Sequence, residues 1–312
     1  MAAELNTKNQ HYVWRHYLSA WAESRTFCCY RQRDRNLFLT QPKAVASETY
    51  FYEIQRLTAE DLKYLDHFVG QATDDGLRKV NREYVQMTQL PFVLRERIKD
   101  VGLLPEAQEA LEEELRWAER NLIERYHTGI EIKCQDILDA LRHGDDTFYA
   151  DSARCIDFLY FLCVQYFRTA NMRDRLGGIP SHMPGHDPQR TANIVNHIHA
   201  TNLGAALFHE RSAYRIVFLH NATATPFIAG DQPVINILDP KVTDDVALYY
   251  PLSPNLAMVL AKNAVDRDRH VTRLEVERYN FSVYAKSDDQ VYSDNMEYLR
   301  SLVAIGKDIL PT

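Results

Sequence analysis

The stretch DSARCIDFLYFLCVQYFRTANMRDRL, from Asp151 to Leu176, decides the fold of this chain. Between Cys155 and Phe167 apolar residues cover nearly every side of a helix, so we expect this helix to lie inside the protein. Gln165 and Arg168 nevertheless stand three residues apart on one side of it. An unpaired buried guanidinium is costly, so an acidic or polar group from elsewhere should meet Arg168.

The composition is that of an ordinary globular protein, with 312 residues, 46% of them hydrophobic and 25% charged. A formal net charge of -7 does not favour wholesale binding to nucleic acid, although a local basic groove stays open. No apolar run has the roughly 20 residues that span a bilayer, and the N-terminal sequence has no signal-peptide core. We therefore expect a cytoplasmic protein with no membrane partner.

Hydrophobic periodicity places helices in the middle of the chain and most strands near its ends. Helical patterns cover 57–70, 76–101, 105–144, 151–176, 191–213, 271–285 and 288–303, and strand patterns cover 27–32, 37–42, 215–221, 226–237, 247–254 and 256–262. The economical fold class is α+β. We expect mainly a helical bundle, packed against a small mixed or antiparallel sheet formed from N-terminal and C-terminal strands.

One face of the predicted helix over 105–144 carries two carboxylates and an imidazole. Glu124, His127 and Glu131 stand at positions i, i+3 and i+7. Glu-x-x-His is the spacing of di-iron bundles, but those need a second copy of the motif, which this sequence lacks, so we expect no metal here. Glu124 or Glu131 is the better candidate as the partner of Arg168.

Five further histidines and one aspartate have two interpretations each. Asp231, in the sequence GDQP, is either a turn residue that binds local amides or a carboxylate at a strand end. His11 follows Gln10 in an aromatic N-terminal segment, and is either a packed histidine or a general acid or base. His182 and His186, with His197 and His199 shortly after, could hold a metal, but their Gly- and Pro-rich loop is more typical of an exposed lid than of a metal cage.

Five short motifs resemble the DUF4238 family, a bacterial family named only as a domain of unknown function. They are QHYVxxxYLxxW (10–21), Phe51-Tyr52, QYFRT (165–169), FIAGDQPV (227–234) and YPLSP (250–254). The family usually has Pro where this chain has Trp14, and Ser where it has Gly230. The resemblance spans nearly the whole chain and implies a single integrated domain over residues 1–312, but it names no reaction.

Two functions remain open. In the first, the protein is a hydrolase or nuclease that acts on a phosphate-containing or nucleic-acid substrate, with a toxin or phage-defence role. Arg168 would neutralise an anion, His11 would move a proton, and Glu124, Glu131 or Asp231 would act as base or metal ligand, with Gln10, Gln165 and Thr169 in binding roles. In the second, the protein is a non-catalytic binding or regulatory module, and Gln165 and Arg168 form a structural network. The sequence leaves both the cofactor and the oligomeric state undetermined.

Overall fold

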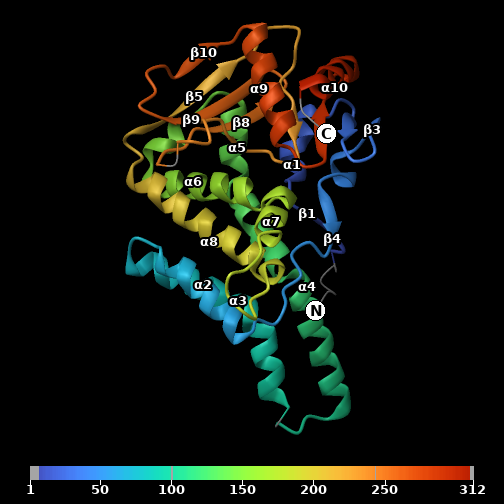
Figure 1. Cartoon of the computed structure of the whole chain (residues 1–312), viewed down its shortest axis with the longest axis vertical. Coiled ribbons are helices and arrows are strands. Elements are labelled where there is room, and N and C mark those ends of the chain that lie inside the picture. The colour runs from blue at the N-terminus through green and yellow to red at the C-terminus, as the bar shows by residue number, and fades with distance from the viewer. Residues whose placement is uncertain (1–6, 100, 243, 310–312) are drawn as a thin grey trace.

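The computed structural model describes residues 7–99, 101–242 and 244–309. Helices form the middle of the molecule, sheets lie at one end, and a long pair of helices projects from the other end (Figure 1). This is an α+β fold, as the sequence predicts. In chain order the helices are α1 (Arg15–Leu18), α2 (Ala59–Gly70), α3 (Asp75–Ile98), α4 (Pro105–Lys133), α5 (Gln135–Arg142), α6 (Ser152–Phe167), α7 (Ala170–Gly177), α8 (Pro188–His209), α9 (Arg273–Lys286) and α10 (Met296–Ile309).

The central helix α6 packs along α8, and its apolar face forms much of the main core. The predicted helix over 151–176 is broken, because α6 ends at Phe167 and α7 begins at Ala170. Thr169 has extended dihedral angles, and its side chain accepts a hydrogen bond from the Met172 N–H at the start of α7. This cap makes the chain turn just after Arg168. Ile156 is 42% exposed, so α6 is not buried on every side.

Two other helix boundaries differ from the prediction. The helical pattern over 105–144 is divided at Cys134, which separates α4 from α5, and Gly129 lies within α4 without ending it. The pattern over 288–303 begins with a strand, β11 (Gln290–Ser293), before α10. The sequence QVYS pairs with a neighbouring strand here, and this tertiary pairing overrides the helical periodicity.

The described strands form three sheets. A four-stranded antiparallel sheet has the order β3 (Asn36–Thr40), β2 (Phe27–Arg31), β11, β6 (Ala229–Gly230), and so joins N-terminal and C-terminal strands as predicted. A five-stranded mixed sheet has the order β10 (Asp268–His270), β5 (Tyr214–His220), β9 (Leu256–Lys262), β8 (Leu248–Ser253), β7 (Ile235–Asn236). The short strands β1 (Asn9–His11) and β4 (Ser47–Thr49) form a separate antiparallel pair.

The N-terminal segment is docked into the core by specific contacts. The Trp21 indole N–H donates to the backbone oxygen of Phe227 at 2.8 Å, and Tyr17 stacks on Tyr250 with ring centroids 4.8 Å apart.

All five cysteines are free and buried. No helix within the described ranges is long and apolar enough to cross a membrane.

Candidate functional site

Arg168 is paired with Glu131, one of the two carboxylates that the sequence offers as its partner. The Arg168 Nη2 group donates to Glu131 Oε1, and the two side chains are only 4% and 11% exposed. Arg168 directly follows the last residue of α6, while Glu131 lies in the last turn of α4. Removing either partner would leave a buried charge uncompensated, which costs about 3–5 kcal/mol in proteins.

Glu124 and His11 lie next to this ion pair. Glu124 is half-buried on α4, two turns before Glu131, and the His11 backbone amide interacts with its carboxylate. The His11 Nε2–H donates to the Lys43 backbone oxygen at 3.1 Å, so the ring's Nδ1 is left as an acceptor. The charge of Arg168 acts on both His11 and Glu124. Strand β1 and helices α4 and α6 thus bring His11, Glu124, Glu131 and Arg168 together, and we call these four residues the acid–base cluster.

Burial shifts the protonation of the cluster. Desolvation raises the pKa of Glu124 to about 7, with nearby Glu131 adding to this shift and Arg168 opposing it. Desolvation also raises the pKa of Glu131, which the Arg168 guanidinium opposes. Desolvation, with the positive charge of Arg15, lowers the pKa of His11 to about 4. At neutral pH the cluster therefore holds a neutral imidazole and a carboxyl that is close to half-protonated.

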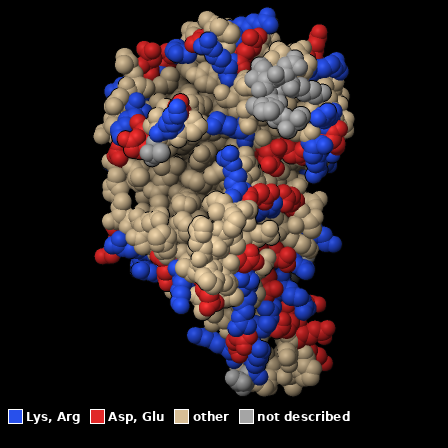
Figure 2. All heavy atoms as spheres, in the orientation of Figure 1, with Lys and Arg blue, Asp and Glu red and all other residues tan. Residues whose placement is uncertain are grey.

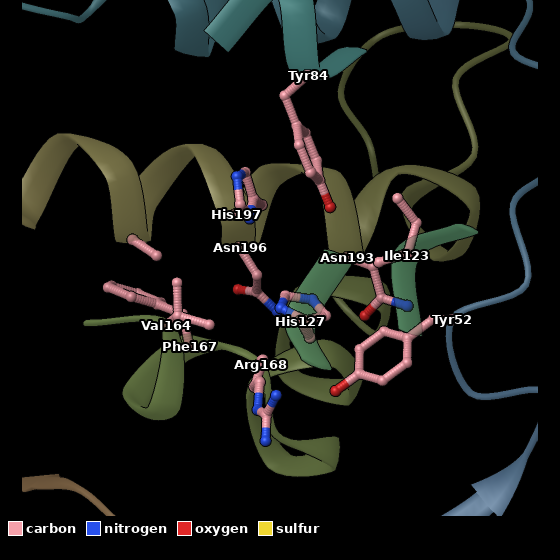
Figure 3. A pocket seen from close by; sticks show the side chains of 11 residues that line it. Tyr52, Tyr84, Ile123, His127, Val164, Phe167, Arg168, Asn193, Asn196 and His197 are labelled. Atoms are coloured by element: carbon pink, nitrogen blue, oxygen red, sulfur yellow. The ribbon is translucent and has the colours of Figure 1, made fainter. Parts of the chain in front are cut away.

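A small cavity is lined in part by Arg168. Its accessible volume is about 10 Å³, which corresponds to one water molecule. Tyr52 and Arg168 belong both to its wall and to the surroundings of Glu124 and Glu131. Figure 3 shows how side chains from α8, α4 and α3 surround it together with Tyr52, which follows β4. The remaining lining residues are Tyr84, Ile123, His127, Val164, Phe167, Asn193, Asn196, His197 and Ala200.

Several polar atoms around this cavity have no hydrogen-bond partner among the described residues. They are His127 Nδ1, His197 Nδ1, Arg168 Nε and both amide atoms of Asn196. Desolvation lowers the pKa of His197 to about 3 and holds that of His127 well below its usual value, so both rings are neutral. Each unmet buried polar group costs roughly 1–3 kcal/mol. Such groups rarely gather in a native core without a reason, so the cavity is part of the candidate site.

Gln10, Thr169 and Gln165 flank the cluster in different ways. Gln10 is fully buried, where its amide donates to the Arg120 backbone oxygen at 2.5 Å and accepts from the Tyr52 N–H at 2.8 Å. Thr169 donates to Gln232 Oε1 at 2.5 Å, which links QYFRT to GDQP. Gln165 is fully buried, and neither of its amide atoms has a partner within the described ranges. The first two residues thus hold the backbone on either side of the cluster.

Asp231 is placed apart from the other predicted residues. Its carboxylate accepts three backbone N–H groups, those of Asp288, Asp289 and Gln290, each at 2.8 Å. Burial raises the pKa of Asp231, and these amides oppose that rise. Across the described ranges it makes no hydrogen bond or ion pair with His11, Glu124, Glu131 or Arg168. Asp231 therefore fixes the start of β11 in this structure.

Gly230 has a steric explanation. A Cβ atom at this position would overlap Ser287 Oγ and would also lie 3.2 Å from a methyl carbon of Val283. The hydroxyl of Ser287 thus occupies the space that a serine at position 230 would need.

The loop histidine His186 is engaged by its neighbours. Its Nδ1 bonds to Ser181 Oγ at 2.6 Å and its Nε2 to Thr191 Oγ1 at 2.8 Å, while the ring stacks on Tyr64. Asp187 then caps α8. With both ring nitrogens occupied, His186 acts here as an organiser of the loop.

Sequence reasoning missed several residues of the site. Tyr52 belongs to a motif that was used only as evidence of family resemblance. No feature of the sequence around Tyr84 indicated a functional role. Asn193 and Asn196 stand with His197 at positions i, i+3 and i+4 of α8, whose residues are mostly buried. The sequence offered His197 only as a possible metal ligand near the loop, and the two asparagines were missed. A polar row of this kind in a buried helix is a signal that could have identified them.

One of three comparisons with known proteins gave a match. The family model described as "Protein of unknown function (DUF4238)" matches residues 9–297. Neither the search of curated proteins nor the search of solved structures gave a match. The matched range includes the whole acid–base cluster and every residue of the cavity wall. The chain belongs to the DUF4238 family.

Proposed function

We propose that this protein is a hydrolase that acts on a phosphate-containing substrate, with the acid–base cluster as its catalytic centre. The observation that carries the proposal is Glu124, a half-buried carboxyl whose pKa is raised to about 7 beside the Glu131–Arg168 ion pair. A group with a pKa near the working pH transfers protons efficiently in both directions. Its ionised form would take a proton from the attacking water, and its protonated form would give one to the leaving group.

The other members of the cluster have supporting roles in this proposal. Glu131 keeps Arg168 in place, and the Arg168 charge favours ionisation of Glu124. Neutral His11 presents Nδ1 as an acceptor, suited to orienting a water molecule. The cavity that Arg168 helps to line gives room for one further water or a substrate oxygen.

Arg15 would attract the anionic substrate. It is exposed, it has no ion-pair partner among the described residues, and its charge acts on His11, Glu124 and Glu131. The charge of Arg168 is already balanced by Glu131, so it is less available to a substrate than the sequence suggested. In this proposal Arg15 binds the phosphate, and Arg168 positions the carboxylates.

The buried state of Arg168 favours the second candidate, a non-catalytic binding or regulatory module. The Arg168 side chain is only 4% exposed, so its guanidinium is as well suited to fixing the register between α4 and α6 as to binding a ligand. The bond between Thr169 and Gln232 has the same structural character. In this alternative the cluster holds the helices in place, and the cavity holds only solvent.

An activity assay with a matched pair of variants distinguishes the two candidates. Hydrolysis of 4-nitrophenyl phosphate, bis(4-nitrophenyl) phosphate and single-stranded RNA and DNA is measured for the wild type, Glu124→Gln and Glu113→Gln. Glu113 is exposed on the same helix and makes no ion pair among the described residues. We expect Glu124→Gln to lose at least about a hundredfold in kcat, because proton transfer contributes on that scale, and Glu113→Gln to retain full activity.

Two further measurements complete this test. Arg15→Ala should raise KM with little change in kcat, since it removes binding that is equal in the ground and transition states. A toxin or phage-defence role predicts that expression of the wild type slows growth and that Glu124→Gln does not. Equal hydrolysis by the wild type and Glu124→Gln would contradict the catalytic proposal and favour the binding module.

We also propose that residues 1–312 act as one integrated unit in the cytoplasm. The cluster draws on β1, α4 and the end of α6, and the Trp21 bond to Phe227 ties the N-terminal segment to the C-terminal half. The five free, buried cysteines are in keeping with a reducing compartment. Limited proteolysis tests the first point, because a separable domain would survive as a stable fragment.

A further inference from the structure

A polar pocket lies between the β1–β4 pair and the ends of β2 and β11. Its volume is about 480 Å³, a size that suits a small organic molecule. Its wall includes Tyr12, directly after β1, Glu48 in β4, Gln32, directly after β2, and the residues 288–290 at the start of β11. None of the described residues in this wall belongs to the acid–base cluster or to the cavity that Arg168 helps to line. We call it the sheet-edge pocket.

The hydroxyl of Tyr12 faces this pocket without a partner. Tyr12 is only 4% exposed, and its hydroxyl makes no hydrogen bond to any described residue. The pocket has three acidic wall residues, and the charges of all of them, Glu48, Asp288 and Asp289, act on this hydroxyl. The hydroxyl is therefore directed toward the acidic side of the wall.

Gln290 offers an unpartnered donor to the same pocket. Gln290 is 9% exposed, and its Oε1 accepts from the Ala46 N–H at 3.2 Å and from the Tyr292 hydroxyl at 2.9 Å. Its Nε2 group can only donate, and it has no acceptor among the described residues. Unmet polar groups on buried side chains are unfavourable, so Tyr12 and Gln290 together indicate a bound molecule that accepts hydrogen bonds.

The pocket also carries one carboxylate that no cation balances. Figure 2 shows acidic and basic side chains interspersed over the visible surface, so the charge of a region depends on its individual ion pairs. Glu48 is paired with Arg173 at 2.8 Å. Asp289 is paired with Arg33 at 3.3 Å. Asp288 makes no ion pair with any described residue, and its carboxylate accepts no hydrogen bond among them.

The surroundings of Asp288 favour a positive charge. Desolvation raises the pKa of the Asp288 carboxyl. Three negative charges add to this rise, those of Asp174, Asp289 and Glu48, and Arg173 opposes it. Arg173 is itself shared, because it pairs with Asp174 at 2.7 Å as well as with Glu48. A cation bound beside Asp288 would relieve this repulsion.

An organic cation fits the wall better than a metal ion does. Within the described ranges, no group of three histidine, cysteine or acidic side chains is arranged to hold a metal. Hard metal ions take several oxygen ligands, whereas two of the three wall carboxylates are bound to arginines. An ammonium group needs only hydrogen-bond acceptors, which Asp288 provides together with Gln32, whose Nε2 donates to the Ser287 backbone oxygen and leaves Oε1 available.

We propose that the sheet-edge pocket binds a small organic ammonium ion that also carries hydroxyl groups, such as an amino sugar. The ammonium group lies beside Asp288 and donates to its carboxylate and to Gln32 Oε1. The hydroxyl oxygens accept from Gln290 Nε2 and from the Tyr12 hydroxyl. The proposal does not depend on the catalytic proposal, because the two sites share no described residue.

Isothermal titration calorimetry with three probes tests which groups of the ligand are recognised. Glucosamine carries both the ammonium and the hydroxyl groups, glucose lacks the ammonium, and cyclohexylamine lacks the hydroxyls. Glucosamine should bind saturably, and each of the other two should bind at least about tenfold more weakly, since each forfeits hydrogen bonds that the wall offers.

Two variants test the residues without removing any bond that holds the fold. Asp288→Asn should weaken glucosamine binding at least about tenfold, because it removes the unbalanced charge. Tyr12→Phe should weaken glucosamine about threefold or more and leave cyclohexylamine unchanged, since only the hydroxyl contact is lost. The control Glu113→Gln, exposed on α4 and far from the wall in sequence, should bind glucosamine as the wild type does. Circular dichroism checks that each variant is folded.

Three results would overturn the proposal. The first is glucosamine that does not bind, or that binds Asp288→Asn as tightly as the wild type. The second is glucose that binds as tightly as glucosamine, because the ammonium group is then not recognised. The third is binding of Ca²⁺ or Mg²⁺ that Asp288→Asn abolishes and that glucosamine does not compete with, which would assign the pocket to a metal ion.

Discussion

Glu124 should make the stability of this protein fall as the pH rises. The pKa of Glu124 is raised from 4.5 to about 7 by its burial in the folded protein. Between these two values the folded state keeps a proton that the unfolded state has released, so folding is progressively disfavoured as pH increases. One pKa unit corresponds to 1.36 kcal/mol, so the full effect above pH 7 is about 3 kcal/mol.

The substitution Glu124→Gln isolates this effect, because glutamine resembles the protonated carboxyl at every pH. The free energy of unfolding is measured by urea titration at pH 5 and pH 8. At pH 8 we expect Glu124→Gln to be more stable than the wild type by up to about 3 kcal/mol, and at pH 5 this difference should fall to about 0.8 kcal/mol. The control Glu113→Gln, on the exposed surface of α4, should change neither value appreciably.

The free energy of unfolding must be compared between the wild type and Glu124→Gln at each pH, because His11 changes stability with pH in the opposite direction. The pKa of His11 is lowered from 6.5 to about 4, so its contribution to stability is lost as the pH falls through that window. The difference between the wild type and Glu124→Gln removes this background. A variant that is no more stable than the wild type at pH 8, or that gains equally at both pH values, would refute the argument for a protonated Glu124.

Three further predictions concern stability and are measured by the same urea titration. Arg168→Met and Glu131→Gln should each destabilise the fold by about 3–5 kcal/mol. The double variant should lose much less stability than the sum of the two single losses, and additive losses would contradict the buried ion pair. Asn196→Leu should stabilise the fold by about 1–2 kcal/mol because it removes unpartnered amide atoms, and a loss would show that the amide is hydrogen-bonded in solution. Gly230→Ser should destabilise the fold by about 1–3 kcal/mol, and Ser287→Gly should restore most of this loss; no rescue would exclude Ser287 as the cause.

Much of the site was present in the sequence as a set of candidates. The apolar surroundings of Arg168 predicted a buried partner, and helical spacing placed Glu124 and Glu131 on one face of α4. The structure brings both to Arg168, but only Glu131 forms the ion pair. Periodicity alone cannot distinguish the two carboxylates, because it fixes a face of a helix and leaves open which turn of that face meets the neighbouring helix.

Other residues could not be predicted because their roles depend on distant segments. The sequence did not decide whether Asp231 is a turn residue or a site residue. In the structure its carboxylate accepts three backbone N–H groups at the start of β11, which gives it a structural role. The strand β11 itself was interpreted as part of a helix, since one of its two partners, β2, lies more than two hundred residues earlier in the chain and the other, β6, is only two residues long. Propensity within a short segment is too weak to reveal a pairing of that range.

The sequence by itself determined the α+β class, the largely buried helix that carries Arg168 at its end, though not where that helix ends, and the need for a charged partner there. These follow from local periodicity and from the high free energy of a buried, unpaired charge. Only the tertiary structure decided that Glu131 pairs with Arg168 while Glu124 stands beside them with a raised pKa. Desolvation and the positions of neighbouring charges depend on the packing of β1, α4 and α6, which no single segment of the chain encodes.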